Sequence, residues 1–186
     1  MKTLKNKKKI EIFLRVLQEK DVTKKYVKWL NDYNVVKFTE QRFKRHTYKD
    51  VKNFVREKNK SKNNFLFGIF IDKSLNKNSY SKKNIEHVGN IKLGPINFTH
   101  KFAYISYIIG ETKYWGMGIT TLAIKKIINI ASNKYKLKKL QTGCYSINIG
   151  SKKVLEKNKF IREGILKSHI IYKGRRCNHF IYGLKL

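Results

Sequence analysis

Residues 113–120 read Lys-Tyr-Trp-Gly-Met-Gly-Ile-Thr and contain two glycines spaced by one residue. This stretch follows an apolar strand pattern at residues 102–109 and opens the best helical pattern in the chain, at residues 116–133. Gly116 and Gly118 let the backbone turn tightly and approach a ligand closely. The free N–H groups and positive dipole end of a helix start suit a pyrophosphate. The stretch therefore predicts a phosphate-binding turn. The alternative is a glycine-eased strand-to-helix connection that binds nothing.

Two other phosphate-binding motifs do not fit these residues. A dinucleotide-binding turn needs a third glycine and a downstream acidic residue for the ribose, and neither follows here. A P-loop needs Gly-Lys-Ser/Thr, whereas Gly118 is followed by Ile119.

Apolar periodicity elsewhere predicts an α/β domain with a mixed central sheet of about seven strands flanked by helices. Seven runs have the apolar character of strands: residues 10–17, 65–71, 88–93, 102–109, 140–145, 161–171 and 178–184. Helices are expected after Asp21, after Thr47, and at residues 116–133 and 151–157. Since the chain contains no internal repeat, residues 1–186 are expected to form a single domain.

Local signals define these elements more closely. Asp21 is expected to cap the first helix, which stops at residues 31–34 and has an apolar side of Tyr26, Val27, Trp29 and Leu30. Thr47 and Asp50 have the spacing of a capping box, before an apolar stripe of Val51, Phe54 and Val55. Residues 35–46 are expected to be irregular, residues 72–84 a mobile loop, and residues 97–101 and 173–174 turns.

The charge of the chain is strongly positive, because 43 Lys and Arg residues outnumber 12 Asp and Glu residues and give +31. Such an excess can mark a nucleic-acid-binding protein. Here the lysines are scattered and accompany abundant Asn and Ile and a single proline, Pro95, a composition that A/T-rich codons also produce. Codon bias is the favoured explanation and a nucleic-acid partner the alternative. A basic surface would also steer a polyanionic cofactor or a nucleotide-linked substrate.

A second motif begins with Asn148-Ile149-Gly150-Ser151 and continues through residues 154–160, Val-Leu-Glu-Lys-Asn-Lys-Phe. Asn148 lies where a predicted strand ends and a predicted helix begins. Taken alone, Asn148 and Ser151 would be ordinary helix-capping residues.

Together the two motifs resemble the GNAT superfamily of acetyl-CoA-dependent N-acetyltransferases. The cofactor loop of that family reads Arg/Gln-x-x-Gly-x-Gly/Ala, and Lys113 here replaces its first residue. The second motif is similar to Asn-x-x-Ser-x-x-x-x-Glu-Lys-x-Gly-Phe, with Lys159 in place of the glycine. Residues 29–32, Trp-Leu-Asn-Asp, are similar to a branch that includes ribosomal-protein N-terminal acetyltransferases. The resemblance runs from about Ile10 to Leu184.

The resemblance implies a GNAT fold that uses acetyl-CoA and no metal. Two central strands would splay, and the pantetheine arm would pair with backbone near Ile108 and Ile109, where an N–H can polarise the thioester carbonyl. Many relatives place a tyrosine acid where this chain has Leu155, so Ser151 is expected to act on the departing sulfur. The cofactor-binding residues implied are Ile108, Ile109, Tyr114, Trp115, Gly116, Met117, Gly118, Ile119, Thr120, Asn148, Ser151 and Lys157.

Residues 38–47, with residues 89–93 and 143–145, are similar to a branch that acetylates nucleotide-linked aminosugars during surface glycan biosynthesis. Examples of its acceptors are 4-amino-4,6-dideoxy sugars on the way to pseudaminic-type acids. Arg42, Arg45 and His46 suit a diphosphate or nucleotide, and Glu40 suits removal of a proton from the amine. The alternative is a surface ion pair between Glu40 and Arg42. Ser151 and Glu40 are the expected catalytic residues, and Glu40, Arg42 and His46 the expected substrate-binding residues.

Other chemistries and partners fit less well. The histidines have no metal spacing, and Cys177-Asn178-His179 is too short for a zinc site. Cys144 and Cys177 form no disulfide framework and no apolar run is long enough to cross a bilayer, so a cytoplasmic enzyme is expected. The competing functions are N-terminal acetylation of a ribosomal protein and nucleic-acid binding without catalysis. A basic enzyme docks poorly on a basic ribosomal tail, which favours the nucleotide-linked aminosugar.

Overall fold

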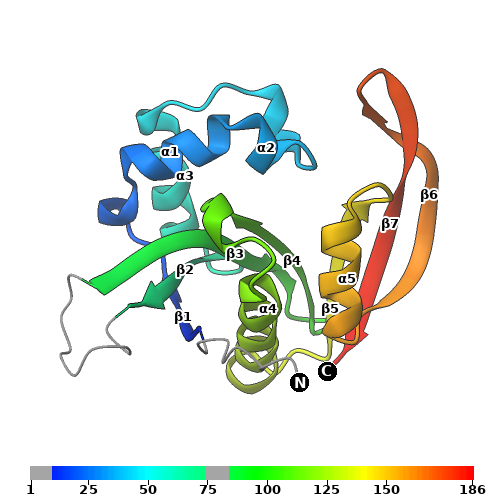
Figure 1. The fold of residues 1–186 in the computed structure, drawn as a ribbon. Coiled ribbons are helices and arrows are strands. Elements are labelled where there is room, and N and C mark those ends of the chain that lie inside the picture. The colour runs from blue at the N-terminus through cyan, green and yellow to red at the C-terminus, as the bar shows by residue number, and fades with distance from the viewer. Residues whose placement is uncertain (1–9, 74–83) are drawn as a thin grey trace, which may run out of the picture.

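The computed structural model describes residues 10–73 and 84–186 and contains one seven-stranded sheet in the order β1-β2-β3-β4-β5-β7-β6 (Figure 1). The strands are β1 (Ile12–Val16), β2 (Phe65–Asp72), β3 (Ile85–Asn97), β4 (Phe102–Ile109), β5 (Lys139–Tyr145), β6 (Ile161–Tyr172) and β7 (Arg175–Lys185). Neighbouring strands are antiparallel except β4 and β5, which are parallel. The α/β class and the mixed seven-stranded sheet predicted from the sequence are thereby confirmed.

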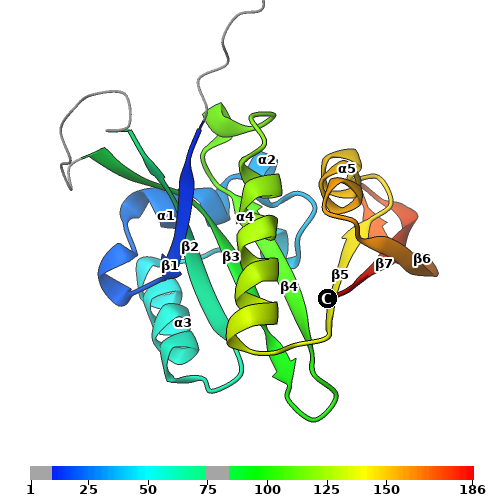
Figure 2. The same cartoon turned by 90° about the horizontal axis from the view of Figure 1, so that it is seen from below.

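Helices cover both faces of the sheet (Figures 1 and 2). One face carries α1 (Lys24–Asn31), α2 (Tyr33–Val36) and α3 (Tyr48–Lys60); the other carries α4 (Ile119–Asn129) and α5 (Ile149–Lys157). Each face has its own core. Val51 and Val55 of α3 pack with Trp29 of α1 on the first face, and Ile124 and Ile127 of α4 are fully buried on the second. Burial of apolar side chains on both faces is the main force that holds these layers together.

The parallel pair β4 and β5 separates part of the way along its length. Its register covers Phe102 with Lys139, Ala103 with Leu140, and Tyr104 with Gln141. Beyond this point β4 continues to Ile109 and β5 to Tyr145 without pairing to each other. Figure 2 shows the two strands diverging, with α4 and α5 beside them. The splay implied by the family resemblance is therefore present, and it opens an internal edge of the sheet.

The local predictions are confirmed in most cases. The capping box at α3 is present, because Thr47 accepts a hydrogen bond from the backbone N–H of Asp50 and Asp50 accepts one from that of Thr47. The turn at residues 98–101 joins β3 to β4, and the turn at Lys173 and Gly174 joins β6 to β7. Most of the loop expected at residues 72–84 lies outside the described residues, and Asp72 is still part of β2.

Several details of the prediction were wrong. The cap of α1 is Thr23, whose side chain accepts from the N–H of Tyr26, because Asp21 belongs to a preceding 3-10 turn where it pairs with Arg15. Phe54 on α3 is exposed rather than part of the apolar stripe. Residues 35–46, expected to be irregular, contain the end of α2 and a 3-10 helix, Glu40–Phe43. The first strand is shorter than predicted, at Ile12–Val16.

The helix predicted at residues 116–133 begins later than expected. Its first residue is Ile119, and a π-helical segment, Ile130–Lys134, continues it. Gly116 and Gly118 belong to the preceding turn, with φ of 76° and 81°. Left-handed backbone of this kind favours glycine. No helix in the described part of the chain is long and apolar enough to span a membrane.

Candidate active site

The turn before α4 exposes backbone donors. Gly118 is the residue that precedes the helix, and it has no side chain with which to cap the first-turn N–H groups. A Cβ built at Gly116 or at Gly118 would meet no protein atom within 4 Å. The space in front of this helix start is therefore open, and the free N–H groups and the positive end of the helix dipole face it.

A cavity of about 500 Å³ runs from this turn to the splayed strands. Among the described residues, the charged side chains that line it are Lys37, Lys153 and Lys157, and none is a carboxylate. A positively charged wall beside a helix start suits a polyanion such as the phosphates of coenzyme A. The cofactor-binding residues predicted from the sequence that line this one cavity are Ile108, Ile109, Tyr114, Trp115, Gly116, Gly118, Ile119, Thr120, Asn148, Ser151 and Lys157. Met117 does not line it, and its side chain is exposed.

The free edge of β4 supplies a further backbone donor. The N–H of Gly110 bonds to the carbonyl of Val88, and Ile109 lies opposite Gly89. In an antiparallel ladder hydrogen-bonded and non-bonded pairs alternate, so Ile109 is in a non-bonded pair and turns its N–H away from β3, toward the splay. The neighbouring residue Ile108 lies opposite Asn90 in a hydrogen-bonded pair, so its N–H points toward β3. Of these two predicted residues, only Ile109 presents its N–H to the cavity. The carbonyl of Ile109 accepts from Nε1 of Trp115 at 3.0 Å.

The second motif holds Ser151 at the other side of the splay. The side-chain oxygen of Asn148 accepts from the backbone N–H of Ser151 at 3.1 Å, which caps α5. Oγ of Ser151 lies 2.6 Å from Oη of Tyr107, a residue of β4. Burial raises the pKa of Tyr107 far above its ordinary value, although the hydrogen bond with Ser151 lowers it. Leu155 is fully buried. Two hydroxyl groups, those of Tyr107 and Ser151, are therefore in contact at the splay.

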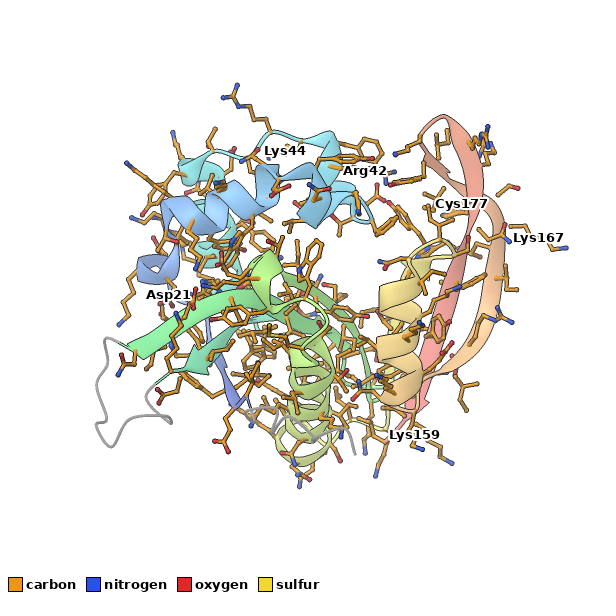
Figure 3. The ribbon with its side chains drawn as sticks, viewed as in Figure 1. Asp21, Arg42, Lys44, Lys159, Lys167 and Cys177 are labelled. Atoms are coloured by element: carbon orange, nitrogen blue, oxygen red, sulfur yellow. The ribbon has the colours of Figure 1, made fainter. Side chains whose placement is uncertain are left out.

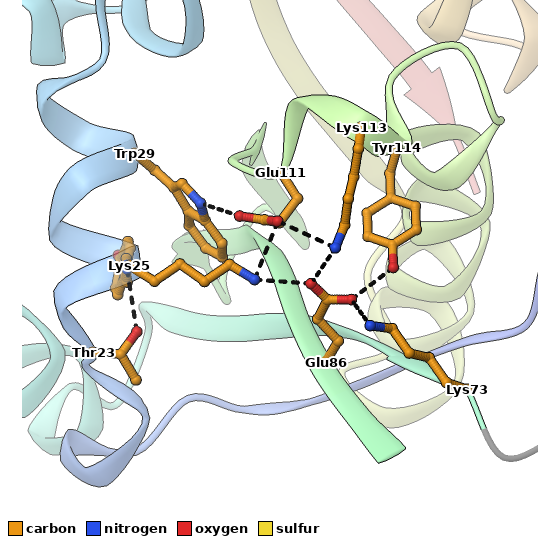
Figure 4. Close-up of polar contacts among 9 residues, drawn as sticks. Thr23, Lys25, Trp29, Lys73, Glu86, Glu111, Lys113 and Tyr114 are labelled. Atoms are coloured by element: carbon orange, nitrogen blue, oxygen red, sulfur yellow. Dashed lines mark hydrogen bonds and ion pairs between the residues drawn. The ribbon is translucent and has the colours of Figure 1, made fainter. Parts of the chain in front are cut away.

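A network of charges anchors the turn (Figure 4). The carboxylate of Glu86 accepts from Nζ of Lys113 at 2.8 Å and from Oη of Tyr114 at 2.6 Å. Nζ of Lys25, from α1, lies 2.9 Å from Glu86 and 3.2 Å from Glu111. Burial alone would raise the pKa of Glu86, but hydrogen bonds from Lys113, Lys73, Tyr114 and Lys25 hold it well below its usual range. Lys113, which replaces the family's Arg or Gln, thus ties the turn to β3.

The segment predicted to contact the acceptor lies across the cavity from α5. Phe38 and Thr39 line the cavity, and the exposed Glu40 accepts a hydrogen bond from Oη of Tyr145, a buried residue of β5. Arg42 lies on the side of this segment that faces the β6–β7 hairpin (Figure 3) and donates to the carbonyls of Lys37 and Ile171, both at 2.8 Å.

The surface ion pair between Glu40 and Arg42 does not form in the described structure, since each side chain has a different partner. Nε2 of His46 lies 3.2 Å from the carbonyl of Gln41. None of the three residues predicted to bind the acceptor, Glu40, Arg42 and His46, lines this cavity itself.

Sequence reasoning missed the partners of these side chains. Tyr107, Tyr145 and Glu86 lie far along the chain from the residues they contact, and no local spacing points to them. The tyrosines follow an alternating pattern in their strands that a core residue would produce equally well. Among the described residues, no group of three His, Cys, Asp or Glu side chains could hold a metal ion.

Comparison with known families gives one domain match. The model of the acetyltransferase (GNAT) domain matches residues 11–161. The probable N-acetyltransferase YjcK of Bacillus subtilis (strain 168) is 33% identical over 82 residues, which cover 44% of this chain and 45% of that protein. The uncharacterized N-acetyltransferase p20 of Bacillus licheniformis is 26% identical over 103 residues, which cover 55% and 57%. The chain spans about half the length of the curated relatives it matches.

Solved structures share the fold over almost the whole chain. A GNAT-family acetyltransferase from Bacillus anthracis superposes with a TM-score of 0.75 at 22% identity, covering 95% of this chain and 96% of that chain. A spermidine N-acetyltransferase from Vibrio cholerae, crystallised with CoA and spermine, superposes with a TM-score of 0.77 at 16% identity, covering 94% and 95%. At these identities the likeness concerns the fold alone.

Proposed function

The chain belongs to the GNAT acetyltransferase family, and from this premise we propose that it transfers the acetyl group of acetyl-CoA to an amine. The observation that carries the proposal is the cavity that joins the uncapped start of α4 to the splayed edge of β4. A pyrophosphate suits the start of α4, and an extended arm that contains amides suits the splayed edge of β4. Acetyl-CoA has both parts, and it supplies the activated acetyl group.

Different residues are proposed to bind the cofactor and to assist the chemical step. The backbone of Gly116 to Thr120 would hold the pyrophosphate, with Lys157 and Asn148 along the cavity wall. The N–H of Ile109 is the donor that faces the splay, where it can stabilise negative charge on a carbonyl oxygen. Ser151 is proposed to donate to the sulfur that departs, and Glu40 to accept the proton of the amine directly or through water.

We propose a nucleotide-linked aminosugar as the acceptor, such as a 4-amino-4,6-dideoxy sugar used in surface glycan biosynthesis. Glu40 is the carboxylate nearest in sequence to the cavity wall at Thr39, and it is exposed to an incoming amine. Arg42 and His46 are proposed to hold the diphosphate of this acceptor. A guanidinium has five N–H donors, and Arg42 donates to two backbone carbonyls, so further N–H groups are left for the diphosphate. A chain of net charge +31 also attracts a nucleotide diphosphate.

The same charge argues against two other acceptors. Spermidine, which the Vibrio cholerae enzyme is named for, and a basic ribosomal N-terminus are both cationic and would be repelled by a chain of this charge. The test is acetyl-CoA turnover by the purified chain with nucleotide-linked aminosugars, spermidine and N-terminal peptides as acceptors. Turnover with the aminosugars alone is the expected result. Turnover confined to spermidine or peptides would overturn the acceptor proposal, and no turnover with any amine would overturn the proposed activity.

A further inference from the structure

Two hydroxyl groups meet where the cavity passes between the splayed strands. Oη of Tyr107 on β4 lies 2.6 Å from Oγ of Ser151 in the first turn of α5, and both residues line the cavity. They are 44 residues apart in the chain. Both side chains are partly buried, and a contact this short constrains the rotamer of each.

The hydrogen bond between them has a preferred direction. A phenol O–H is a stronger acid than an aliphatic O–H and is therefore the better donor, while the serine oxygen is the better acceptor. The Tyr107 ring is mostly buried and its phenol stays protonated, because burial raises its pKa. With Tyr107 donating to Oγ, the hydroxyl hydrogen of Ser151 is left to donate elsewhere.

The neighbouring groups leave that hydrogen available. Asn148 Oδ1 is already engaged with the backbone N–H of Ser151. Cys144 lies close enough to interact with Ser151, but burial raises the pKa of its thiol to about 11, and a neutral thiol is only a weak acceptor. Leu155, at the position of the family's tyrosine acid, offers no polar group.

We propose that Tyr107 is a positioning residue that donates to Ser151 Oγ and thereby aims the serine hydroxyl at the departing sulfur. The inference rests on the proposed acetyl transfer and adds the residue that makes Ser151 effective. The ammonium first gives a proton to Glu40 or water, the free amine then forms the new carbon–nitrogen bond, and the nitrogen finally releases a second proton to water. The sulfur keeps the electron pair of the broken carbon–sulfur bond and is stabilised by the Ser151 hydrogen bond. Neither Tyr107 nor Ser151 loses a proton.

The first experiment is a double-mutant cycle on turnover. Tyr107→Phe keeps the ring that lines the cavity and should lower kcat about threefold to tenfold with the KM for acetyl-CoA unchanged. Ser151→Ala should lower kcat by at least as much. Because Tyr107 acts only through Ser151, Tyr107→Phe added to Ser151→Ala should cause no further loss. Tyr104→Phe is the matched control, since Tyr104 lies on the same strand and is 43% exposed.

The second experiment uses bound CoA and needs no acceptor. If Ser151 donates to sulfur, the thiol of CoA in the complex should ionise at lower pH in the wild type than in either variant. Ultraviolet absorbance of the thiolate should show a shift of at least about half a pH unit, equivalent to about threefold. Calorimetry at fixed pH should show that the variants still bind CoA.

The outcomes separate the two proposals. Wild-type kcat in Tyr107→Phe, a further loss in the double variant, or an unshifted thiol titration would overturn the role of Tyr107 while leaving the acetyltransferase proposal intact. Failure of the wild type to bind CoA would overturn the proposed function and the inference together.

Discussion

The orientation of the Glu40 side chain depends on a residue in a distant part of the chain. Glu40 is exposed, yet its carboxylate is held by the phenol of Tyr145, which is buried in β5. The phenol stays neutral, because burial first and the hydrogen bond to Glu40 second raise the pKa of Tyr145. The hydrogen bond to Tyr145 thus orients the Glu40 carboxylate, although the residue is exposed.

Substitution of Glu40 tests its role as the base. Glu40→Gln keeps the shape of the side chain but cannot take a proton, so it should lower kcat/KM for the acceptor by about 10²-fold or more. The loss should be largest at low pH, where the amine is mostly ammonium. The KM for acetyl-CoA should stay unchanged, because Glu40 does not line the cofactor cavity.

The matched control for this measurement is Glu57→Gln. Glu57 is an exposed residue of α3 on the first face of the sheet. Steady-state kinetics across pH on both variants decide the matter. Equal acceptor kinetics in Glu40→Gln and in the wild type would assign the segment a structural role only.

At the scale of elements, the turn before α4 depends on its left-handed glycines. Gly118→Val should weaken acetyl-CoA binding at least about tenfold, because a branched side chain would occupy the space that the pyrophosphate needs. A Cβ at Gly118 meets nothing within 4 Å, so the added Cβ itself does not clash with the protein. Isothermal titration calorimetry measures it.

Backbone strain needs its own control, since valine is disfavoured at φ of 81°. Gly174 has φ of 74° in the β6–β7 turn, and a Cβ there likewise meets nothing within 4 Å. Gly174→Val should therefore lose similar stability but bind acetyl-CoA normally. If Gly118→Val binds acetyl-CoA as tightly as the wild type, the pyrophosphate does not bind at this turn.

The Glu86 network connects the turn to α1 and β3 and makes a pH-dependent contribution to stability. The pKa of Glu86 is lowered in the folded state, so its contribution is complete above its ordinary value of 4.5 and is lost as the pH falls below it. Glu86→Gln should therefore be less stable than the wild type by about 1 to 3 kcal/mol at pH 7. The difference should shrink at pH 3.

Urea denaturation at the two pH values measures this difference. Glu57→Gln, on the exposed face of α3, should change stability little at either pH. A pH-independent deficit in Glu86→Gln would mean that the carboxylate contributes through packing and not through its charge.

At the scale of the whole molecule, charge should select the acceptor. With a net charge of +31, the KM for a nucleotide-linked aminosugar should rise several-fold between about 50 and 200 mM NaCl. The KM for a neutral amine should change much less. Steady-state kinetics over this salt range measure both KM values. Equal responses of the two KM values to salt would mean that the positive charge does not contribute to acceptor binding.

The same titration separates catalysis from nucleic-acid binding. A nucleic-acid-binding module loses affinity for DNA or RNA steeply with salt and shows no turnover. If acetyl transfer persists at a salt concentration where DNA binding is lost, catalysis does not depend on nucleic-acid binding.

The sequence by itself was sufficient for the α/β class, the strand count and the glycine turn before α4, whose binding of phosphate stays a prediction. These follow from local signals: apolar periodicity marks the strands and α4, and two glycines at positive φ mark the turn. Local chemistry also predicts the Thr47 capping box, because its donors and acceptors lie within three residues. It misplaced the cap of α1, since Asp21 has a stronger partner in Arg15.

Only the tertiary structure decided which side chains meet. The contacts of Tyr107 with Ser151, Tyr145 with Glu40 and Arg42 with Ile171 join positions 44, 105 and 129 residues apart. Such pairs depend on strand order and on the point where β4 and β5 diverge, and neither is encoded in a local window. Periodicity determines which face of an element a residue occupies, whereas packing of the elements determines what lies opposite it.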